Sequence, residues 1–518
     1  MRFEKELPEP AATAIMRPAM QTLDWLLLTL YGVAVLALGY AARHRQRDSE
    51  EFLLGGRRLP WPLVGVSILA TAFSAASLLG GPGEAFAHGM LWMQLQLGDL
   101  LAIIIVIWLF LPYLRGLTLD TAYEYLERRF GLAVRLFASA LFHLQVIFRT
   151  GILLYGPALA LATVTGVDVR AAIVVVGIIA TLYTVMGGIT AVVWTDALQL
   201  GMVLLGVGLS AGIVASLLPG GFREAFDVAA EAGRFQWIDP EQPVSSVRSL
   251  LGATIGYGVL SLSVAGTNQQ PVQRYLSCES VASARRAAFL GWAVGAVITF
   301  LTLLLGVLLF AFYRQNPTAL GEGLAGDAIF PHFIATQLPP GVTGLLVAAI
   351  FAAAMSSLDS ALNSMSSATL CDFHDRLSAG DMSAARRLQL ARRWTVVWGL
   401  VGIAAGLYVA GRGSLLAMAV RYVGYFAGPV LGLFLLGFLS PRTGQRAALW
   451  GSGISFGGVL FLVKAPAWLG VDLPFQGIWL AFGGTLLSLL AGLTASLFCA
   501  KPEAGQLDGL CRGHELTP

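Results

Sequence analysis

The chain has 518 residues, of which 56% are hydrophobic and only 12% are charged. A soluble domain carries roughly 25% charged residues, so this composition excludes an ordinary soluble globular protein. The net charge is only +3, and no basic patch indicates a nucleic-acid partner. The four cysteines are scattered and predict no disulfide framework.

The apolar runs are roughly 20 residues long, as in membrane-spanning helices, and do not alternate as barrel strands do. We therefore predict an all-α integral membrane protein with about 13 spans. The predicted spans cover 22–42, 61–87, 90–114, 133–163, 168–187, 190–218, 247–269, 287–313, 341–372, 390–410, 414–438, 446–466 and 475–499.

An odd number of spans places the two termini on opposite sides of the membrane. With the N-terminus outside, the cytoplasmic segments hold 21 of the 33 Lys and Arg residues, and the outer segments hold ten. This bias predicts an extracellular segment at 1–21 and a cytoplasmic tail at 500–518, in a plasma (inner) membrane protein. Residues 1–21 have no basic leader with a cleavage site, so we expect the first span to be retained.

Two predicted spans contain helix-breaking residues near their middles. Span 61–87 ends its run of small residues in Gly-Gly-Pro-Gly, and span 247–269 is rich in Gly and Ser before Asn268-Gln-Gln-Pro. Interrupted spans at matching places in two halves predict an inverted-repeat transporter with a binding site near the midplane. Close helix packing through small residues is the alternative explanation.

Span 341–372 carries a polar seam on one helical face, because its polar residues recur at steps of one, three and four. Polar groups at membrane depth must face protein, water or an ion. Oxygen ligands without thiols or imidazoles suit a hard cation such as sodium. The seam therefore indicates ion-coupled transport. It consists of Ser356, Ser357, Ser360, Asn363 and Ser364.

Arg149 lies near the middle of span 133–163. A guanidinium at the centre of a membrane helix costs at least about 2.5–3.5 kcal/mol, so it needs a partner. Two hypotheses remain open: a fork that receives a substrate carboxylate, or a permanent ion pair with an acid at similar depth. Asp196 and Asp359 are the acids that could form such a pair.

Asp196 lies on the cytoplasmic side of span 190–218, where it could serve a departing cation or simply be an acid at a helix end.

A group of residues at the end of span 341–372 superficially resembles metal ligands, but its spacing matches no zinc pattern, so we predict a solvated helix end. That group is Cys371, Asp372, His374 and Asp375.

Three motifs resemble those of the sodium:solute symporter family, whose members have the leucine-transporter fold. They are Tyr183–Gln199, Gln270–Ser277 and Ser356–Ser360, and the resemblance covers about residues 50–440. It implies a single transporter domain at 22–499 that starts with one extra helix. The inverted repeats would be 61–218 and 247–438, followed by two peripheral helices at 446–499.

The resemblance also implies a sodium site. The family's common site would use the carbonyls of Ala70, Phe73 and Ala353 and the hydroxyls of Ser356 and Ser357.

A second sodium site, present in some members, would use Asp196, Ser356 and Ser360. Those members often have a hydroxyl where this chain has Asp359. This extra carboxylate could strengthen the second site or take a proton.

For the substrate, the runs 121–130 and 151–166 look like the branch that carries monocarboxylates, vitamins and iodide. Bacterial sialic-acid symporters have an arginine that matches Arg149 and engages the substrate carboxylate. The pocket partners would then be Ser74, Ser77 and Gln96.

We therefore expect a monomeric sodium-coupled symporter that imports a small organic anion, with Na+ as coupling ion and no cofactor. The alternative is a sodium or proton symporter for a neutral solute such as a vitamin-like compound, an amino acid or a sugar. We do not expect an enzyme, because no catalytic cluster has suitable spacing. A transporter-like sensor with an attached signalling module is a further alternative, which the short tail disfavours.

Overall fold

The structure is a computed structural model, and it describes residues 20–42, 48–321, 324, 326–378, 382–411, 415–469 and 477–513. Within these ranges the regular structure is helical, apart from one isolated bridge between Leu59 and Cys278. Most of the predicted segment 1–21 and the end of the predicted tail lie outside the described residues.

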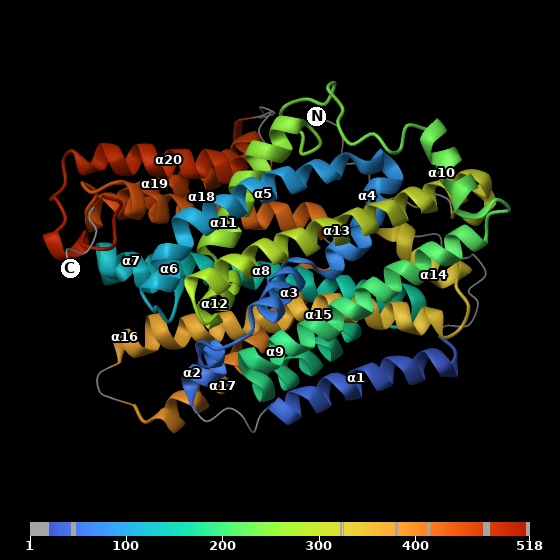
Figure 1. Ribbon diagram of the computed structural model, residues 1–518, viewed down its shortest axis with the longest axis horizontal. Helices are drawn as coiled ribbons and strands as arrows, with labels where there is room; N and C mark the ends of the chain where they lie inside the picture. Colours follow the sequence, from blue (N-terminus) through green and yellow to red (C-terminus); the bar gives the residue numbers. More distant parts are fainter. Residues whose placement is uncertain are drawn as a thin grey trace.

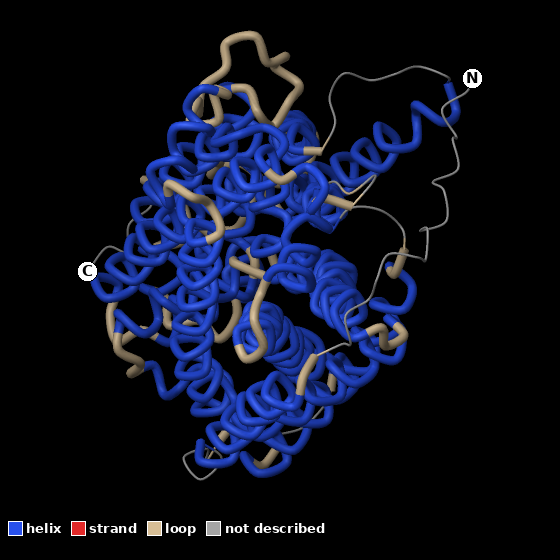
Figure 2. Tube along the Cα trace, turned by 90° about the vertical axis from the view of Figure 1, so that its right-hand side faces the viewer, coloured by secondary structure: helices blue, strands red, loops and turns tan. Residues whose placement is uncertain are grey.

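The long helices run roughly side by side, with α1 and α20 at opposite edges (Figure 1). Loops join them, including a long one over residues 232–251 (Figure 2). The helices of the first part are α1 (Thr22–Ala42), α2 (Ser49–Leu54), α3 (Trp61–Ala72), α4 (Ala75–His88), α5 (Leu95–Ile105), α6 (Leu111–Gly116), α7 (Ala122–Phe130), α8 (Leu132–Thr165), α9 (Val169–Ser216) and α10 (Gly221–Glu231). The later helices are α11 (Tyr257–Thr267), α12 (Gln269–Ser277), α13 (Val281–Gln315), α14 (Ile329–Gln337), α15 (Val342–Ala368), α16 (Asp375–Leu377), α17 (Ala384–Val409), α18 (Leu415–Leu439), α19 (Gln445–Leu469) and α20 (Ile478–Ser496).

Nine helical stretches of the described chain are long and apolar enough to cross a membrane. The predicted total of about 13 spans is reached when both arms of α9, the interrupted pairs α3–α4 and α11–α12, and α17 are included. One boundary was wrong. The helical path predicted to end at residue 269 continues through α12 to Ser277.

Helix α9 contains two of the predicted spans, and the chain turns between them at Gly188. The backbone there has φ 55° and ψ −170°, a conformation that is essentially restricted to glycine. A Cβ atom at this position would lie 2.8 Å from the carbonyl oxygen of Phe52. The glycine is therefore required both by the backbone angle and by the close approach of α2.

Both spans that were predicted to be interrupted are broken. Phe73 and Ser74 adopt extended backbone angles between α3 and α4. Asn268 does the same between α11 and α12, and its side chain caps α12 by accepting a hydrogen bond from the Gln270 backbone N–H at 2.9 Å. The breaks expose main-chain groups in the interior, where a ligand can use them.

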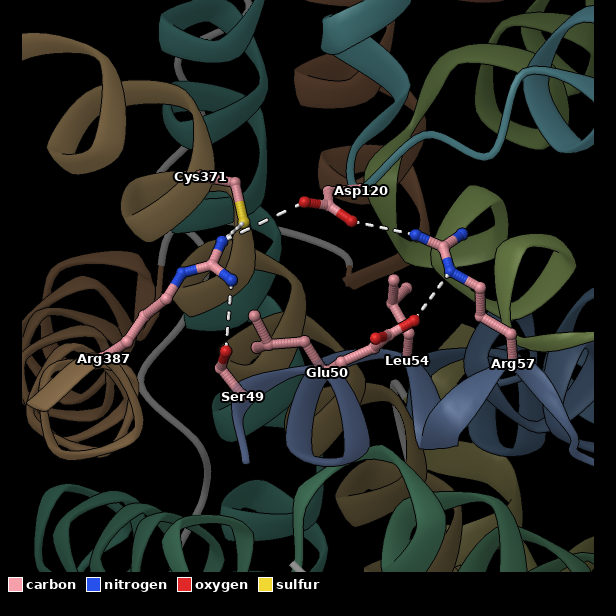
Figure 3. Close-up of a pocket in the computed structure, with 8 residues that line it drawn as sticks. Ser49, Glu50, Leu54, Arg57, Asp120, Cys371 and Arg387 are labelled. Carbon is pink, nitrogen blue, oxygen red and sulfur yellow. Dashed lines mark hydrogen bonds and ion pairs between the residues drawn. The ribbon is translucent and has the colours of Figure 1, made fainter. Parts of the chain in front are cut away.

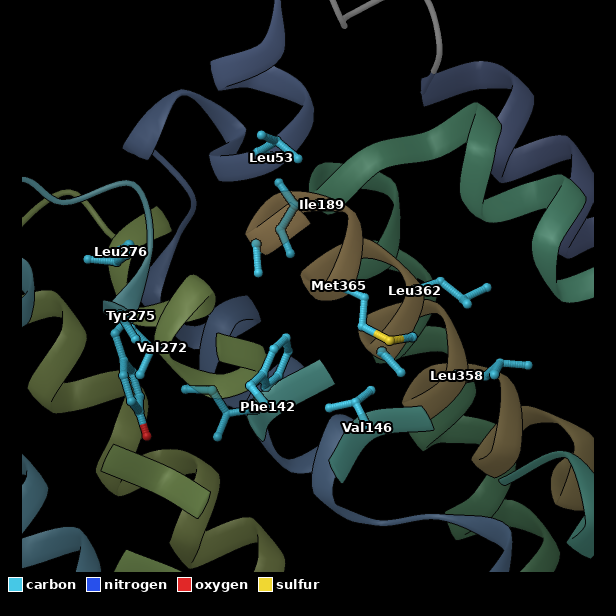
Figure 4. Close-up of a cluster of buried hydrophobic side chains, with 14 of the residues drawn as sticks. Leu53, Phe142, Val146, Ile189, Val272, Tyr275, Leu276, Leu358, Leu362 and Met365 are labelled. Atoms are coloured by element: carbon cyan, nitrogen blue, oxygen red, sulfur yellow. The ribbon is translucent and has the colours of Figure 1, made fainter. Parts of the chain in front are cut away.

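Helix α15 lies at the centre of the protein, and 94% of the residues in its most apolar 18-residue stretch are buried. One face is apolar: Leu358, Leu362 and Met365 belong to a cluster that includes Phe142 and Val146 of α8 (Figure 4). The opposite face carries the polar seam toward α3. The core therefore encloses the seam on a helix that lipid cannot reach.

We expect Gly188→Ala to lower the free energy of unfolding by about 1–3 kcal/mol, because alanine strains this backbone conformation. Gly201→Ala is the matched control, since Gly201 lies on the same helix and a Cβ added there would meet no atom within 4 Å. Thermal unfolding in detergent measures both. Equal melting temperatures for the two variants would contradict the conclusion that the backbone at position 188 requires glycine.

Candidate functional site

The break after α3 leaves carbonyl groups without helical partners, and these face α15. Ser356 Oγ donates to Ala70 O at 2.9 Å, and Phe73 O lies 3.3 Å from Ser357 Oγ. Ser356 Oγ also lies 3.0 Å from Ala353 O. All five residues are buried. The structure thus brings together every residue that the resemblance implied for the first sodium site.

Oxygen atoms outnumber the available hydrogens in this cluster. Ser357 Oγ lies 3.0 Å from Thr71 O and 3.4 Å from Ala70 O as well. A hydroxyl has one hydrogen, so it cannot satisfy all these carbonyls at once. An oxygen-rich, thiol-free cage of this kind suits a hard monovalent cation. Thr71 O belongs to this cluster, although the sequence did not single it out.

The residues named for the second sodium site do not share one centre. Ser360 Oγ accepts from Arg274 Nη2 at 2.5 Å, and Asp196 Oδ2 lies 3.2 Å from the same nitrogen. The Asp359 carboxylate accepts from Tyr183 OH at 2.6 Å. Asp196 and Ser360 are therefore connected through an arginine, whereas Asp359 contacts α9.

Arg274 follows the predicted span 247–269, so the sequence places it among the 21 cytoplasmic Lys and Arg residues. That placement was wrong. Arg274 is fully buried on α12. The polar composition of α12 hides its burial from a hydropathy argument, although one apolar face packs into the hydrophobic core (Figure 4), formed by Val272, Tyr275 and Leu276. The place of Arg274 in the Gln270–Ser277 motif, directly after the break, was the available signal.

Arg149 reaches the break in α3 from α8. Its Nη2 donates to Thr71 O at 2.9 Å, and its Nη1 donates to Gln270 Oε1 at 2.9 Å. Among the described residues no carboxylate lies within ion-pairing distance of it, so the predicted alternative of a pair with Asp196 or Asp359 is not seen. Its side chain is only partly buried.

The other predicted pocket residues lie on the two helices after this break. Ser74 is buried at the N-terminus of α4, and the Ser77 backbone N–H donates to its carbonyl at 3.0 Å. Gln96 lies on α5, where its Nε2 is 3.4 Å from Thr299 Oγ1 of α13. Ser74 is thus three residues along the chain from Thr71, whose carbonyl accepts from Arg149, while Gln96 faces α13.

The predicted solvated helix end at Cys371–Asp375 was wrong for Cys371 and Asp372, which are both buried. This aspartate is fully buried and forms an ion pair with Arg135 Nη2 at 2.7 Å. Its carboxylate also accepts from Thr121 Oγ1 at 2.6 Å and Ser139 Oγ at 2.8 Å. The described residues contain no group of three or more His, Cys, Asp or Glu that could hold a metal ion.

A polar cavity of about 200 Å³ lies nearby, between α2, the segment before α7 and α17 (Figure 3). Asp120 bridges two arginines there: its Oδ1 is 2.9 Å from Arg57 Nη2, and its Oδ2 is 4.0 Å from Arg387 Nη2. Arg387 also pairs with Asp375 at 2.7 Å. Burial, with a smaller effect of Glu124, raises the pKa of Asp120 despite these arginines. The network ties together four chain segments.

Comparison with known proteins identifies the family. The model of the sodium:solute symporter family matches residues 52–455. The chain belongs to this family. It is 31% identical over 505 residues to the sodium/sialic acid symporter NanT of Aliivibrio fischeri, covering 95% of this chain and 97% of NanT. It is also 32% identical over 430 residues to human sodium-coupled monocarboxylate transporter 1, covering 81% of this chain and 69% of that protein.

The fold agrees with this membership. A solved structure of a substrate-bound, outward-open Na+-coupled sialic acid symporter superimposes with a TM-score of 0.84 at 31% identity, over 93% of this chain and 99% of that one. The nucleobase-cation symporter Mhp1 shares the fold alone, with a TM-score of 0.53 at 16% identity. The predicted leucine-transporter-type architecture is confirmed.

We expect Asp120→Ala to increase thiol labelling of Cys371 severalfold, because Asp120 helps hold closed the cavity that Cys371 lines. Cys371 is only 4% exposed in the intact network. Mass spectrometry of the labelled peptide measures the reaction at this cysteine alone. Asp227→Ala, which removes an exposed acid on α10, is the control; identical labelling in both variants would show that the network does not close the cavity.

Proposed function

We propose that the protein is a sodium-coupled symporter that imports a small organic anion, a monocarboxylate or a sialic-acid-like acid, by alternating access. One observation carries the proposal. The carbonyl of Thr71 accepts from Arg149 Nη2 at 2.9 Å and from Ser357 Oγ at 3.0 Å. The candidate anion-binding group and the candidate sodium cage therefore meet at a single peptide group.

This shared peptide supplies a physical basis for coupling. A sodium ion held by Ala70, Phe73, Ala353, Ser356 and Ser357 fixes the interrupted segment between α3 and α4. Fixing that segment also fixes the carbonyl that positions Arg149. Sodium then favours the state that accepts the anion, and by linkage the anion raises the affinity for sodium.

The surroundings of Arg149 support an anionic substrate. Among the described residues, the Arg149 guanidinium bonds to an amide and a carbonyl and has no carboxylate partner, so no acid of this part of the chain neutralises it. A planar carboxylate can accept two parallel hydrogen bonds from it. Ser74, Ser77 and Gln96 are proposed as further pocket groups. The names of the relatives NanT and monocarboxylate transporter 1 also specify acids.

The energetics suit uptake against a gradient. One sodium ion that moves down a membrane potential of 100 mV contributes about 2.3 kcal/mol, which corresponds to a roughly fiftyfold solute gradient. The concentration difference of sodium adds to this. We propose the N-terminus outside, the C-terminus in the cytoplasm and a functional monomer in the plasma (inner) membrane. The inverted repeats would be 61–218 and 247–438, with peripheral helices at 446–499.

The double substitution Ser356→Ala, Ser357→Ala should abolish sodium-stimulated uptake, because it removes both side-chain oxygens of the cage. Uptake into reconstituted vesicles, with sodium replaced by choline at fixed pH, measures the effect. Ser366→Ala is the control on the same helix, since its hydroxyl donates to Ala391 O, away from α3. Full sodium stimulation in the double variant would refute the site, and equal wild-type uptake in choline would favour proton coupling.

Arg149→Ala should weaken binding of the transported acid by at least about thirtyfold, because a desolvated charge pair contributes about 2 kcal/mol or more. A thermal-shift screen of purified protein against small acids, with and without sodium, identifies the acid first. The same acid as its neutral amide serves as the comparison ligand. If the variant binds acid as tightly as the wild type does, the anion assignment fails.

A further inference from the structure

Asp24, on the first turn of α1, is a carboxylate that is only 2% exposed and that has no part in the transport mechanism described so far. Its Oδ1 accepts hydrogen bonds from the backbone N–H groups of Gly341 and Gly344, each at 2.7 Å. Its Oδ2 accepts from the N–H of Gln21 at 2.8 Å. Three main-chain donors therefore satisfy this buried charge, and one side chain caps both α1 and α15.

The two capped helix ends lie side by side. Each N-terminus carries a positive partial charge from its unpaired N–H groups, so two adjacent ends repel each other. The Asp24 carboxylate lies between them and stabilises both. A Cβ atom on Gly344 would lie 2.4 Å from the Asp24 Cα, so only glycine permits this close approach. The contact thus depends on an acid in α1 and a glycine in α15.

Helix α15 connects this fixed end to the sodium cage. It is continuous from Val342 to Ala368 and contains no proline. Ser356 lies 12 residues beyond Gly344, which is about 18 Å along a helix. Close-packed interiors transmit displacements, so an axial shift at the capped end moves the hydroxyls as well. Because Ser356 Oγ lies 2.9 Å from Ala70 O, a shift of about 1 Å would break this contact.

A second contact between α1 and α15 lies beside the cage. Tyr31 is buried, and its OH donates to the sulfur of Met355 at 3.9 Å. The same hydroxyl accepts from Gln199 Nε2 of α9 at 3.3 Å. Met355 directly precedes Ser356 in the chain. Helix α1 therefore contacts α15 both at its N-terminus and next to the cage.

We propose that Asp24 is a positioning residue for sodium binding. By capping α15 from α1, it fixes this helix at the height where Ser356 and Ser357 meet the carbonyls of the break between α3 and α4. The inference rests on the proposed function, because it takes these hydroxyls as sodium ligands. Asp24 touches neither sodium nor substrate. It raises the population of the state in which the cage is assembled, and thereby the apparent affinity for sodium.

Asp24→Ala should raise the sodium concentration for half-maximal effect about three- to tenfold, the range that corresponds to the loss of one helix cap. Asp24→Asn should change it less than about twofold, because the amide oxygen can replace Oδ1, the atom that accepts from Gly341 and Gly344. Asp24→Ser has a shorter hydroxyl and should fall between. Sodium titrations against choline measure this, by thermal shift of the purified full-length protein and by uptake into vesicles.

Asp168→Ala is the matched control. Asp168 caps α9, where its Oδ1 accepts from the N–H groups of Arg170 and Ala171 at 3.0 Å each. Its loss should lower the melting temperature and leave the sodium response as in the wild type. If Asp24→Ala likewise melts earlier but keeps the wild-type half-saturation by sodium, the cap is purely structural and the proposal is overturned.

The milder variants keep the test decisive even if Asp24→Ala does not fold. Equal half-saturation by sodium in Asp24→Ser and Asp24→Asn would then overturn the proposal. A wild type that does not respond to sodium would refute the proposed function, and the positioning role with it. A wild type that responds, together with Asp24 variants that match it, would overturn this inference alone.

Discussion

The interruption between α3 and α4 is the constraint on which the rest of the site depends. Unpaired carbonyls at membrane depth are unfavourable by several kcal/mol each, unless other groups satisfy them. The hydroxyls of α15 do so, and this requires α15 to be polar on one face and shielded from lipid on all sides. Its position at the centre of the protein follows from that requirement.

The buried charges of the described residues are paired in distinct ways. Asp372 with Arg135 and Asp196 with Arg274 form compact ion pairs that also bond to hydroxyls. Arg149 is different, because its partners are a carbonyl and an amide. The first two arrangements pair opposite charges within the protein, whereas Arg149 has no carboxylate partner among the described residues. The same residue type therefore has different roles according to its partners.

Much of the fold could be predicted because its signals are local. Long apolar runs marked the spans, and clusters of small residues marked both interruptions. The polar seam of α15 followed from helical periodicity alone. The errors fell where polarity was taken to mean exposure: Arg274 and Asp372 were placed at the membrane surface, but both are fully buried. Hydropathy records the character of a residue and cannot register the partner that makes its burial tolerable.

The sequence by itself determined the class of protein, the number of spans, the two interruptions and the seam of hydroxyls, since each of these depends on composition or on residues close together in the chain. Only the tertiary structure decided which charges pair. Arg135 and Asp372 are 237 residues apart, and Arg274 and Asp196 are 78 apart. In a low-dielectric interior the energy of a charge depends on contacts of a few ångströms. Helix packing alone sets those distances. It therefore decides which oxygens form the neutral cluster beside α15 and which carboxylates pair with an arginine.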